Sequence, residues 1–427
     1  MAVEWNTVEL GEVATVRSGY AFKSGDWTDS GVPVVKIANV KGGRLEMSGC
    51  SFVPPDIAAE AGEFQLSQGD ILIAMTGYIG DVARVLTTDL PCVLNQRVGK
   101  FAVRDNRQLD ANYLFSFLSW SETRKIIESL GYGSAQPNVS PSLIHKVEIP
   151  LPSLPVQKRI AEILGSLDDK IELSRRMNET LEAMARAMFQ SWFVDFDPVR
   201  AKLDGRKPAG LDAATAALFP AAFQDSPLGP IPKGWTAGTL NDSFNLTMGQ
   251  SPPGDTYNEE GIGLPFYQGR TDYGFRFPTR RIFCSAPTRF AKPGDTLVSV
   301  RAPVGDINMA EEECCIGRGV AAVRHKTGAP AFTYHAMSNL EPDFAKYEAE
   351  GTVLGSINKQ NFENLRFVTP TPGIVAAFEC LAGPLEYQIR TLETQSRSLA
   401  AMRDALLPKL LSGELDVHGI DKAGATA

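Results

Sequence analysis

The chain has 427 residues, more than one ordinary hydrophobic core accommodates, so two or more domains are expected. Its 43% hydrophobic and 22% charged residues are typical of a globular protein in water. No apolar run approaches the roughly 20 residues that cross a bilayer, and the N-terminus lacks a secretory pattern, so a cytoplasmic protein without a membrane partner is predicted. The formal net charge of −8 disfavours a simple nucleic-acid binder, although binding depends on where the cations lie.

Residues 1–152 are predicted to form a mixed α/β domain. Short apolar runs at 32–37 and 70–75 stand next to Pro and Gly-Asp turns, a pattern that predicts strands entered by turns. A short helix is expected over residues 112–130. The proline-rich stretch 149–155 then predicts a hinge at the end of the domain.

A long amphipathic helix is predicted over residues 153–197. Side chains of one face recur there at steps of three and four, from Ile160 to Trp192. A helix of roughly 40 residues is about 60 Å long, so one small domain cannot cover its apolar stripe. Residues 198–229 are predicted to form a structured linker.

The second half of the chain repeats the first. Gly69-Asp70 and Gly80-Asp81 each have a counterpart 225 residues later, at Gly294-Asp295 and Gly305-Asp306. Blocks near Trp5, Cys92 and Asn138 recur in the same order near Trp235, Cys314 and Ser356. Four matching blocks in one order predict two copies of one fold, and coincidental strand-turn similarity is the alternative.

The repeat predicts the remaining boundaries. A second mixed α/β domain is expected over residues 230–372, with a short helix near residues 331–347. A second long helix follows over residues 373–415 and starts or kinks at Pro384, whose ring removes an amide donor. Residues 416–427 are expected to be a flexible tail.

The two long helices are predicted to pack against each other as an antiparallel pair. Their apolar patterns align at one spacing of 218 residues, so that Leu167 corresponds to Leu385. Polar Ser174, Asn178 and Ser396 interrupt the seams, as residues that fix register and partner do. The alternative is two unrelated core helices in separate domains. The residues predicted to make partner-helix contacts are Leu167, Ile171, Leu181, Met188, Leu385, Ile389, Leu399 and Leu406.

Two segments resemble the specificity (S) subunits of type I restriction-modification systems. The central segment contains Ser191-Trp192-Phe193-Val194-Asp195-Phe196-Asp197-Pro198-Val199 and ends at Ile231-Pro232-Lys233-Gly234-Trp235, and the C-terminal one contains Leu406-Leu407-Pro408-Lys409-Leu410-Leu411-Ser412-Gly413-Glu414-Leu415. With the repeat, the likeness covers nearly the whole chain. The repeat and the resemblance together imply an α+β fold, in which a mixed α/β target-recognition domain followed by a long helix is duplicated in tandem. The two long helices are expected to pack as an antiparallel coiled coil with pseudo-two-fold symmetry.

The resemblance also implies a function. Each recognition domain would read one half of a bipartite, asymmetric site in double-stranded DNA, and the helices would dock two methyltransferase (M) subunits. Those subunits use S-adenosylmethionine, while restriction (R) subunits in the full complex add cleavage with ATP and Mg²⁺. This chain itself is expected to be non-catalytic and to bind no cofactor or metal.

Catalytic alternatives have weak support in the sequence. For a free-standing DNA methyltransferase, Asp197-Pro198-Val199 lacks the second proline and the aromatic residue of a base-holding loop. For a nuclease, the acidic run 311–313 is the candidate metal site, but a solvated turn is favoured. The six cysteines and four histidines show no metal-ligand spacing. A structural scaffold without a DNA role is a third alternative.

The candidate DNA contacts are cations and amides interleaved with aromatic residues. Arg can bond guanine through two hydrogen bonds and Gln can do the same with adenine, while other cations neutralise phosphates. The stretch 267–281 stands out because its arginines outnumber its acids. The predicted DNA-binding residues are Lys36, Asn39, Lys41, Arg44, Tyr78, Asn95, Gln96, Arg97, Gln136, Asn138, Gln268, Arg270, Tyr273, Arg276, Arg280, Arg281, Arg301, Arg318, Asn358 and Lys359.

Overall fold

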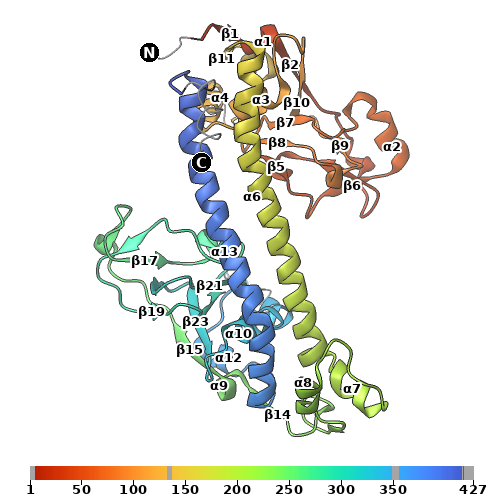
Figure 1. Cartoon of the computed structure of the whole chain (residues 1–427), viewed down its shortest axis with the longest axis vertical. Coiled ribbons are helices and arrows are strands. Elements are labelled where there is room, and N and C mark those ends of the chain that lie inside the picture. The colour runs from red at the N-terminus through yellow and green to blue at the C-terminus, as the bar shows by residue number, and fades with distance from the viewer. Residues whose placement is uncertain (1–4, 132–136, 349–354, 416, 418–427) are drawn as a thin grey trace, which may run out of the picture. The chain divides into compact units, whose positions relative to one another are not determined.

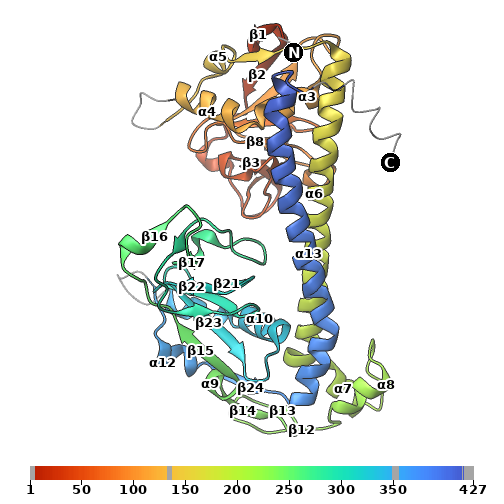
Figure 2. The same ribbon diagram turned by 60° about the vertical axis from the view of Figure 1, so that its left-hand side comes forward.

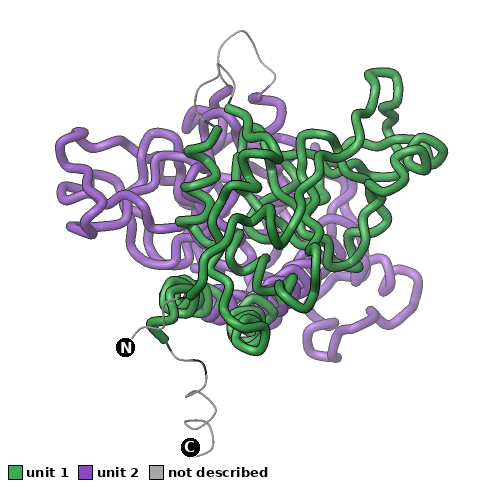
Figure 3. Tube along the Cα trace, turned by 90° about the horizontal axis from the view of Figure 1, so that it is seen from above, with its two compact units in different colours: residues 1–172, 396–427 green, residues 173–395 purple. Residues whose placement is uncertain are grey.

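The structure is a computed structural model that describes residues 5–131, 137–348, 355–415 and 417. The chain divides into two compact units (Figure 3), of which unit 1 comprises residues 1–172 and 396–427 and unit 2 comprises residues 173–395. Each unit holds a mixed α/β domain and part of two long helices, α6 (Leu154–Phe189) and α13 (Pro372–Leu411). Among the described residues, no helix combines the length and apolar character that spanning a membrane requires.

The domain of unit 1 is built on a four-stranded antiparallel sheet (Figure 1). Its strands are β1 (Thr7–Glu9), β2 (Ala14–Ser18), β3 (Val32–Val35), β4 (Val40–Lys41), β5 (Arg44–Leu45), β6 (Ser51–Val53), β7 (Ile71–Ala74), β8 (Val82–Arg84), β9 (Val93–Leu94), β10 (Val98–Val103) and β11 (Glu148–Pro150). Its helices are α1 (Leu10–Val13), α2 (Pro55–Glu60), α3 (Ala111–Leu118), α4 (Ser121–Leu130) and α5 (Pro141–Ile144). The main sheet has the order β2-β10-β7-β8, and smaller sheets β6-β3-β9, β4-β5 and β1-β11 surround it.

Strand β7 explains why the main sheet is buried on both faces. Successive side chains of a strand point to opposite faces. Ile71 and Ile73 therefore enter the core that contains α3, whereas Leu72 and Ala74 enter a second core with Val35. A continuous apolar run, rather than an alternating one, is what a strand between two cores requires.

Unit 2 repeats this topology. Its strands are β12 (Phe223–Gln224), β13 (Ile231–Pro232), β14 (Thr236–Thr239), β15 (Phe244–Met248), β16 (Tyr257–Asn258), β17 (Leu264–Tyr267), β18 (Phe283–Cys284), β19 (Phe290–Ala291), β20 (Thr296–Val300), β21 (Val304–Met309), β22 (Cys314–Ile316), β23 (Val320–His325) and β24 (Arg366–Thr369). Its helices are α7 (Asp197–Leu203), α8 (Ala213–Leu218), α9 (Leu240–Ser243), α10 (Pro330–Ser338), α11 (Glu341–Phe344) and α12 (Lys359–Glu363). The main sheet has the order β15-β23-β20-β21, and the parallel pair β17–β22 corresponds to β3–β9.

Equivalent hydrogen bonds recur in the two units. The Tyr20 amide donates to Leu94 O at 2.8 Å, and the Gln250 amide donates to Ile316 O at 3.0 Å. Gly19 and Gly249, one residue earlier, both lie where a Cβ atom would meet main-chain oxygens of the neighbouring turn. The predicted tandem duplication of one mixed α/β domain is confirmed.

The long helices pair in opposite directions. In unit 1 the start of α6, around Ile160 and Leu164, shares a core with Leu407 and Leu410 near the end of α13. In unit 2 the end of α6 meets the start of α13, where Phe189 packs against Phe378 with ring centroids 5.8 Å apart. The helices are therefore antiparallel, as Figures 1 and 2 show. This antiparallel pairing, the second part of the predicted fold, is also confirmed.

The seam contains most of its apolar side chains where the periodicity places them. Among the predicted partner-helix residues, Leu167 and Ile389 are buried, while Ile171, Leu181, Met188, Leu385, Leu399 and Leu406 are half-buried. Ser174 and Asn178 are buried in α6. Pro384 does not start the second helix, because α13 begins at Pro372 and continues through it. The earlier start follows from Ile374, Val375 and Phe378, which belong to the core of unit 2.

Candidate nucleic-acid interface

Three loops of unit 1 meet at one end of its main sheet. The Met75 amide donates to Arg97 O at 3.1 Å, and the Val139 amide donates to Met75 O at 2.9 Å. The Thr76 hydroxyl donates to Asn138 Oδ1 at 2.8 Å. The structure thus brings together predicted DNA contacts that are far apart in sequence. The loops surround a pocket of ≈ 450 Å³, which is lined by Ser18, Met75, Thr76, Gln96, Arg97, Asn138, Val139, Ser140 and Pro141.

The predicted DNA contacts on these loops fall into two groups. Gln96 and Arg97 are exposed, and Tyr78 is 59% exposed at the tip of the β7–β8 turn. Asn95 is buried, and its Oδ1 accepts the Arg97 amide at 3.3 Å. Asn95 therefore shapes the turn that presents its neighbours, and the prediction that it contacts DNA does not agree with its burial. Gln136 lies outside the described residues.

The basic loop of residues 36–46 in unit 1 is held mainly by its own polar groups. Asn39 is buried, accepts the Lys36 amide at 2.9 Å and donates to Glu46 O at 2.7 Å, so it builds the loop and does not face DNA. The Lys36 ammonium lies 3.8 Å from the Trp27 ring and donates to the Ser51 hydroxyl. Lys41 is exposed and lies 3.9 Å from Glu46.

Unit 2 places a matching set of loops at the same end of its sheet. The Val300 amide donates to Gly319 O at 2.9 Å, and the Ile357 amide donates to Val300 O at 3.0 Å. These bonds correspond to those of Met75 and Val139. Exposed side chains here belong to Gln268, Arg301 and Arg318, and the Gln268 carbonyl accepts the Gly319 amide.

Four further cations of unit 2 that were predicted to contact DNA are paired with acidic residues. Arg270 lies 2.7 Å from Asp306, Arg280 lies 2.5 Å from Glu312, and Arg281 lies 2.8 Å from Asp272. Lys359 lies 3.4 Å from Glu363 one helical turn away. All four cationic side chains are exposed, so a phosphate group can approach them without a rearrangement of the fold.

Three residues of unit 2 that were predicted to contact DNA have structural roles instead. Asn358 caps α12, and its Oδ1 accepts the Asn361 amide at 2.8 Å. Tyr273 packs its ring against the core around Tyr267, and burial raises the pKa of its hydroxyl well above the ordinary value. The prediction that Arg276 contacts DNA is wrong for this structure, because its side chain is fully buried.

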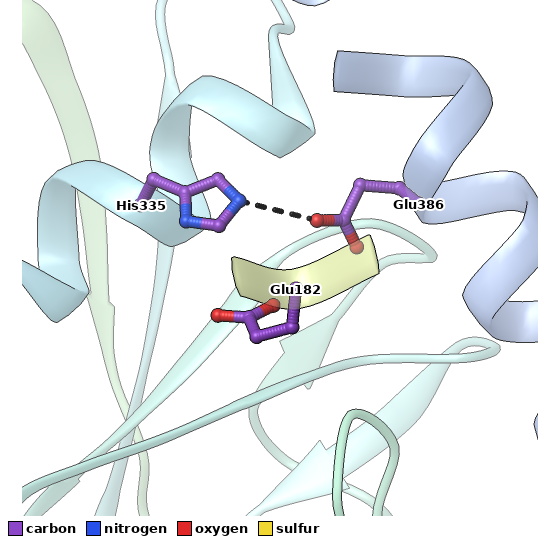
Figure 4. A group of neighbouring side chains, drawn as sticks. All are labelled: Glu182, His335 and Glu386. Carbon is purple, nitrogen blue, oxygen red and sulfur yellow. Dashed lines mark ion pairs between the residues drawn. The ribbon is translucent and has the colours of Figure 1, made fainter. Parts of the chain in front are cut away.

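Arg276 lies among acidic residues of both long helices. Its guanidinium forms ion pairs with Glu182 of α6 and, at 3.3 Å, with Glu386 of α13. It also stacks on the Tyr334 ring, with 3.6 Å between the guanidinium carbon and the ring centroid. His335 of α10 completes the group, with its Nε2 3.4 Å from Glu386 Oε1 (Figure 4). We call Glu182, Arg276, His335 and Glu386 the buried ionic cluster.

The buried ionic cluster has donor atoms of a kind that binds metals. One ligand atom each from Glu182, His335 and Glu386 lies within 4.8 Å of the others. A guanidinium already pairs with both carboxylates, however, so a divalent ion would have to bind beside a fixed positive charge. Burial lowers the pKa of His335, with a smaller opposing effect of Glu386. The arrangement therefore fits an arginine held by two carboxylates better than a metal centre.

This cluster is what the sequence patterns missed. Arg276 stands in a stretch rich in arginine and aromatic residues, which resembles an exposed basic surface. The available indication was on the helices, where Glu182 and Glu386 each follow an apolar seam residue, Leu181 and Leu385. Acidic residues beside a seam commonly pair across it or with a neighbouring domain.

Comparisons with known proteins agree with this architecture. Residues 2–183 match the family described as "Type I restriction modification DNA specificity domain". The chain is 25% identical over 425 residues to a Methanocaldococcus jannaschii chain named by inference as the specificity subunit of the type I restriction enzyme MjaX, and the match covers 97% of this chain and 94% of that one. The MjaVIII specificity subunit of the same organism is 33% identical over 183 residues, covering 42% of this chain and 43% of the relative.

A solved structure shares the fold. The type I restriction-modification S subunit from M. genitalium is 17% identical, with a TM-score of 0.55 and 96% of each chain covered. The same family is indicated by the two repeated domains, by the two antiparallel helices and by the matches over nearly the full length. Residues 2–183 match the DNA specificity domain family, and nearly the whole chain is similar to the specificity subunits of type I restriction-modification systems.

Proposed function

We propose that this chain is the sequence-specific DNA-recognition subunit of a type I restriction-modification complex, in which each domain reads one half of a bipartite site. The observation that carries the proposal is the repeated set of loops at equivalent ends of the two main sheets. Their main chains are held by the same hydrogen bonds, from Met75 and Val139 in unit 1 and from Val300 and Ile357 in unit 2. A fixed framework with variable tips is the usual arrangement of a recognition surface.

The exposed side chains on those loops differ between the units. Unit 1 presents Tyr78, Gln96 and Arg97, whereas unit 2 presents Gln268, Arg301 and Arg318. Arginine and glutamine read guanine and adenine edges in the major groove through paired hydrogen bonds. Different side chains on one framework support two different half-sites, and hence an asymmetric site.

The surface ion pairs supply the phosphate contacts in this proposal. Arg270 and Arg280 exchange their carboxylate partners for DNA phosphates, at little cost because exposed ion pairs contribute only about 0–1 kcal/mol, whereas Arg281 stays paired with the buried carboxylate of Asp272. Part of the neutralisation comes from partner subunits, which accounts for a formal net charge of −8 on a DNA-binding chain. Affinity for the site then falls steeply as salt concentration rises.

Catalysis belongs to other subunits in this proposal. The paired helices α6 and α13 dock two methyltransferase subunits that use S-adenosylmethionine, and restriction subunits add cleavage with ATP and Mg²⁺. Asp197 and Pro198, the closest approach to a base-holding loop, form the first turn of α7, where Pro198 is buried. That turn has a structural role, which supports a non-catalytic chain.

Co-expression with the cognate methyltransferase subunits tests the proposal. Methylome mapping is expected to find modified adenines only within one split sequence, and the same subunits with a chain lacking residues 1–150 are expected to lose that preference. The purified chain alone is expected neither to bind S-adenosylmethionine nor to cut DNA with Mg²⁺. Methylation without sequence preference in the complete complex would refute the proposal.

A further inference from the structure

We infer that Arg276 is a positioning residue for DNA recognition by the second domain, although its side chain is buried and does not contact DNA. It anchors the arginine loop, defined as residues 268–281, to both long helices. The inference rests on the proposed function, because the exposed residues of that loop are candidate DNA contacts. Gln268, Arg270, Arg280 and Arg281 all flank the anchor in sequence.

The anchor is made by the side chain of Arg276. Its guanidinium pairs with Glu182 of α6 through one terminal nitrogen and with Glu386 of α13 through Nε. The two carboxylates come from two helices, so the one guanidinium joins three separate elements of unit 2. A planar guanidinium can hold two carboxylates in fixed directions, whereas a lysine ammonium is a point charge with a flexible stem.

The main chain of the loop is attached to the same places. The Arg276 amide donates to Glu393 Oε1 of α13 at 3.1 Å, and its carbonyl accepts the Met309 amide at 2.8 Å. Asn308 Nδ2 donates to Gly274 O at 3.0 Å. Arg390 of α13 donates to Glu311 O at 2.9 Å and lies over the Phe277 ring. The loop is therefore bound to α13 and β21 at its centre, while its flanks carry the exposed cations.

Burial makes this anchor sensitive to substitution. The Arg276 side chain is 0% exposed and both carboxylate side chains are 11% exposed. Removing the guanidinium leaves two like charges close together in a poorly hydrated space, which favours displacement of the loop. Base discrimination needs side chains placed to within a fraction of an ångström, so a displaced loop loses it while its arginines still attract phosphates.

The test uses the complete complex with methyltransferase subunits and DNA carrying single-base changes in either half-site. Arg276→Met is expected to reduce discrimination in the half-site of the second domain at least tenfold and to leave the first half-site within twofold of wild type. Arg276→Lys is expected to give an intermediate loss. The triple variant Arg276→Met, Glu182→Gln, Glu386→Gln removes all three charges, so it folds if the single variant does not, and it is expected to show the same selective loss.

A control variant and a second readout separate anchoring from general stability and from the proposed function. Arg366→Met removes an exposed arginine of the same domain, in β24, and should change neither half-site. Amide hydrogen exchange of the chain is expected to accelerate at least tenfold in residues 268–281 of the Arg276 variants. Unchanged exchange there, equal losses in both half-sites, or a stoichiometric metal ion in the purified chain overturns the anchor. Absence of any site preference in the wild-type complex overturns the proposed function instead.

Discussion

In unit 2 the recognition domain meets the long helices through Arg276, which is fully buried between Glu182 of α6 and Glu386 of α13. In unit 1 the basic loop meets α6 through Arg44, which lies 3.9 Å from Glu172 and keeps 35% of its side chain exposed. The two domains share one topology, but the ion pairs that attach them to the helices differ in solvent exposure. Duplication therefore preserved the framework, while the attachment to the helices diverged.

The difference has an energetic meaning. An exposed ion pair is solvated in both the folded and unfolded states, so its loss changes little. A buried arginine has no water to replace a missing carboxylate, and a buried carboxylate has none to replace a missing arginine. We therefore expect unit 2 to depend on single charged residues and unit 1 to depend mainly on its apolar seam, around Ile160, Leu164 and Leu410.

The largest expected contrast is between Arg276→Met and Arg44→Met. The first substitution leaves two buried carboxylates without a cation and should lower the free energy of unfolding by roughly 3–5 kcal/mol. The second removes a long, half-exposed pair and should cost less than about 1 kcal/mol. Urea unfolding followed by circular dichroism measures both. Equal losses would mean that burial does not distinguish the two attachments.

A second contrast uses the equivalent glycines before the recognition turns. A Cβ at Gly249 would lie 2.2 Å from Gly317 O, and one at Gly19 would lie 2.6 Å from Asn95 O. Both atoms are main chain, so Gly→Ala at either position should cost about 1–3 kcal/mol through overpacking. Gly254→Ala is the control, because nothing lies within 4 Å of a Cβ there. Thermal unfolding of the three variants tests whether the turns are equally tight.

A third contrast concerns the exposed tips. Arg97→Ala and Arg318→Ala should each remove about 1–3 kcal/mol of discrimination at one base, in one half-site only. Competition binding against single-base variants of the site measures this. A uniform loss over all sequences would assign the substituted arginine to a phosphate contact.

The smallest expected effect is a response to acid in both units. Burial lowers the pKa of His145 in unit 1 and of His325 in unit 2 below the ordinary value of 6.5. The neutral rings accept main-chain amides, from Val16 at 3.0 Å and from Thr327 at 3.2 Å. This stabilisation is complete above pH 6.5 and is lost as pH falls through that value toward the lower folded pKa. Each ring should contribute on the order of 1 kcal/mol.

Denaturant unfolding at pH 7.5 and pH 5.5 measures the acid response. His145→Gln and His325→Gln should each flatten the pH dependence, since glutamine accepts a hydrogen bond without titrating. A wild-type chain that is equally stable at both pH values would contradict the assignment of neutral rings.

Much of the fold follows from periodicity and repetition in the sequence. Side chains at steps of three and four from Ile160 to Trp192 predicted α6, because a helix that must cover another helix has to present one apolar face at that spacing. The matching Gly-Asp pairs predicted equivalent turns, and Gly69, Gly80, Gly294 and Gly305 do have positive φ angles in the structure. Such features are local, so a sequence displays them directly.

The site was less predictable because its roles depend on distant partners. Gln96, Arg97 and Arg318 are exposed on the loops where they were expected. Asn39, Asn95 and Arg276 carry the same chemical groups but are buried. Asn39 is hydrogen-bonded to Glu46, Asn95 is hydrogen-bonded within the 95–97 turn, and Arg276 is paired with an acidic residue of a long helix. Residue type alone cannot separate an arginine that meets DNA from one that meets a glutamate of another element.

The discontinuous composition of unit 1 has a consequence for biosynthesis. Its core contains Leu407, Leu410 and Leu411 from the far end of the chain. A nascent polypeptide that has not yet left the ribosome beyond residue 396 therefore exposes Ile160 and Leu164 without their covering side chains. Unit 2 is continuous, from residue 173 to residue 395, and can close earlier. The N-terminal domain is thus synthesised first and completed last, and chaperones or proteases have longest access to it.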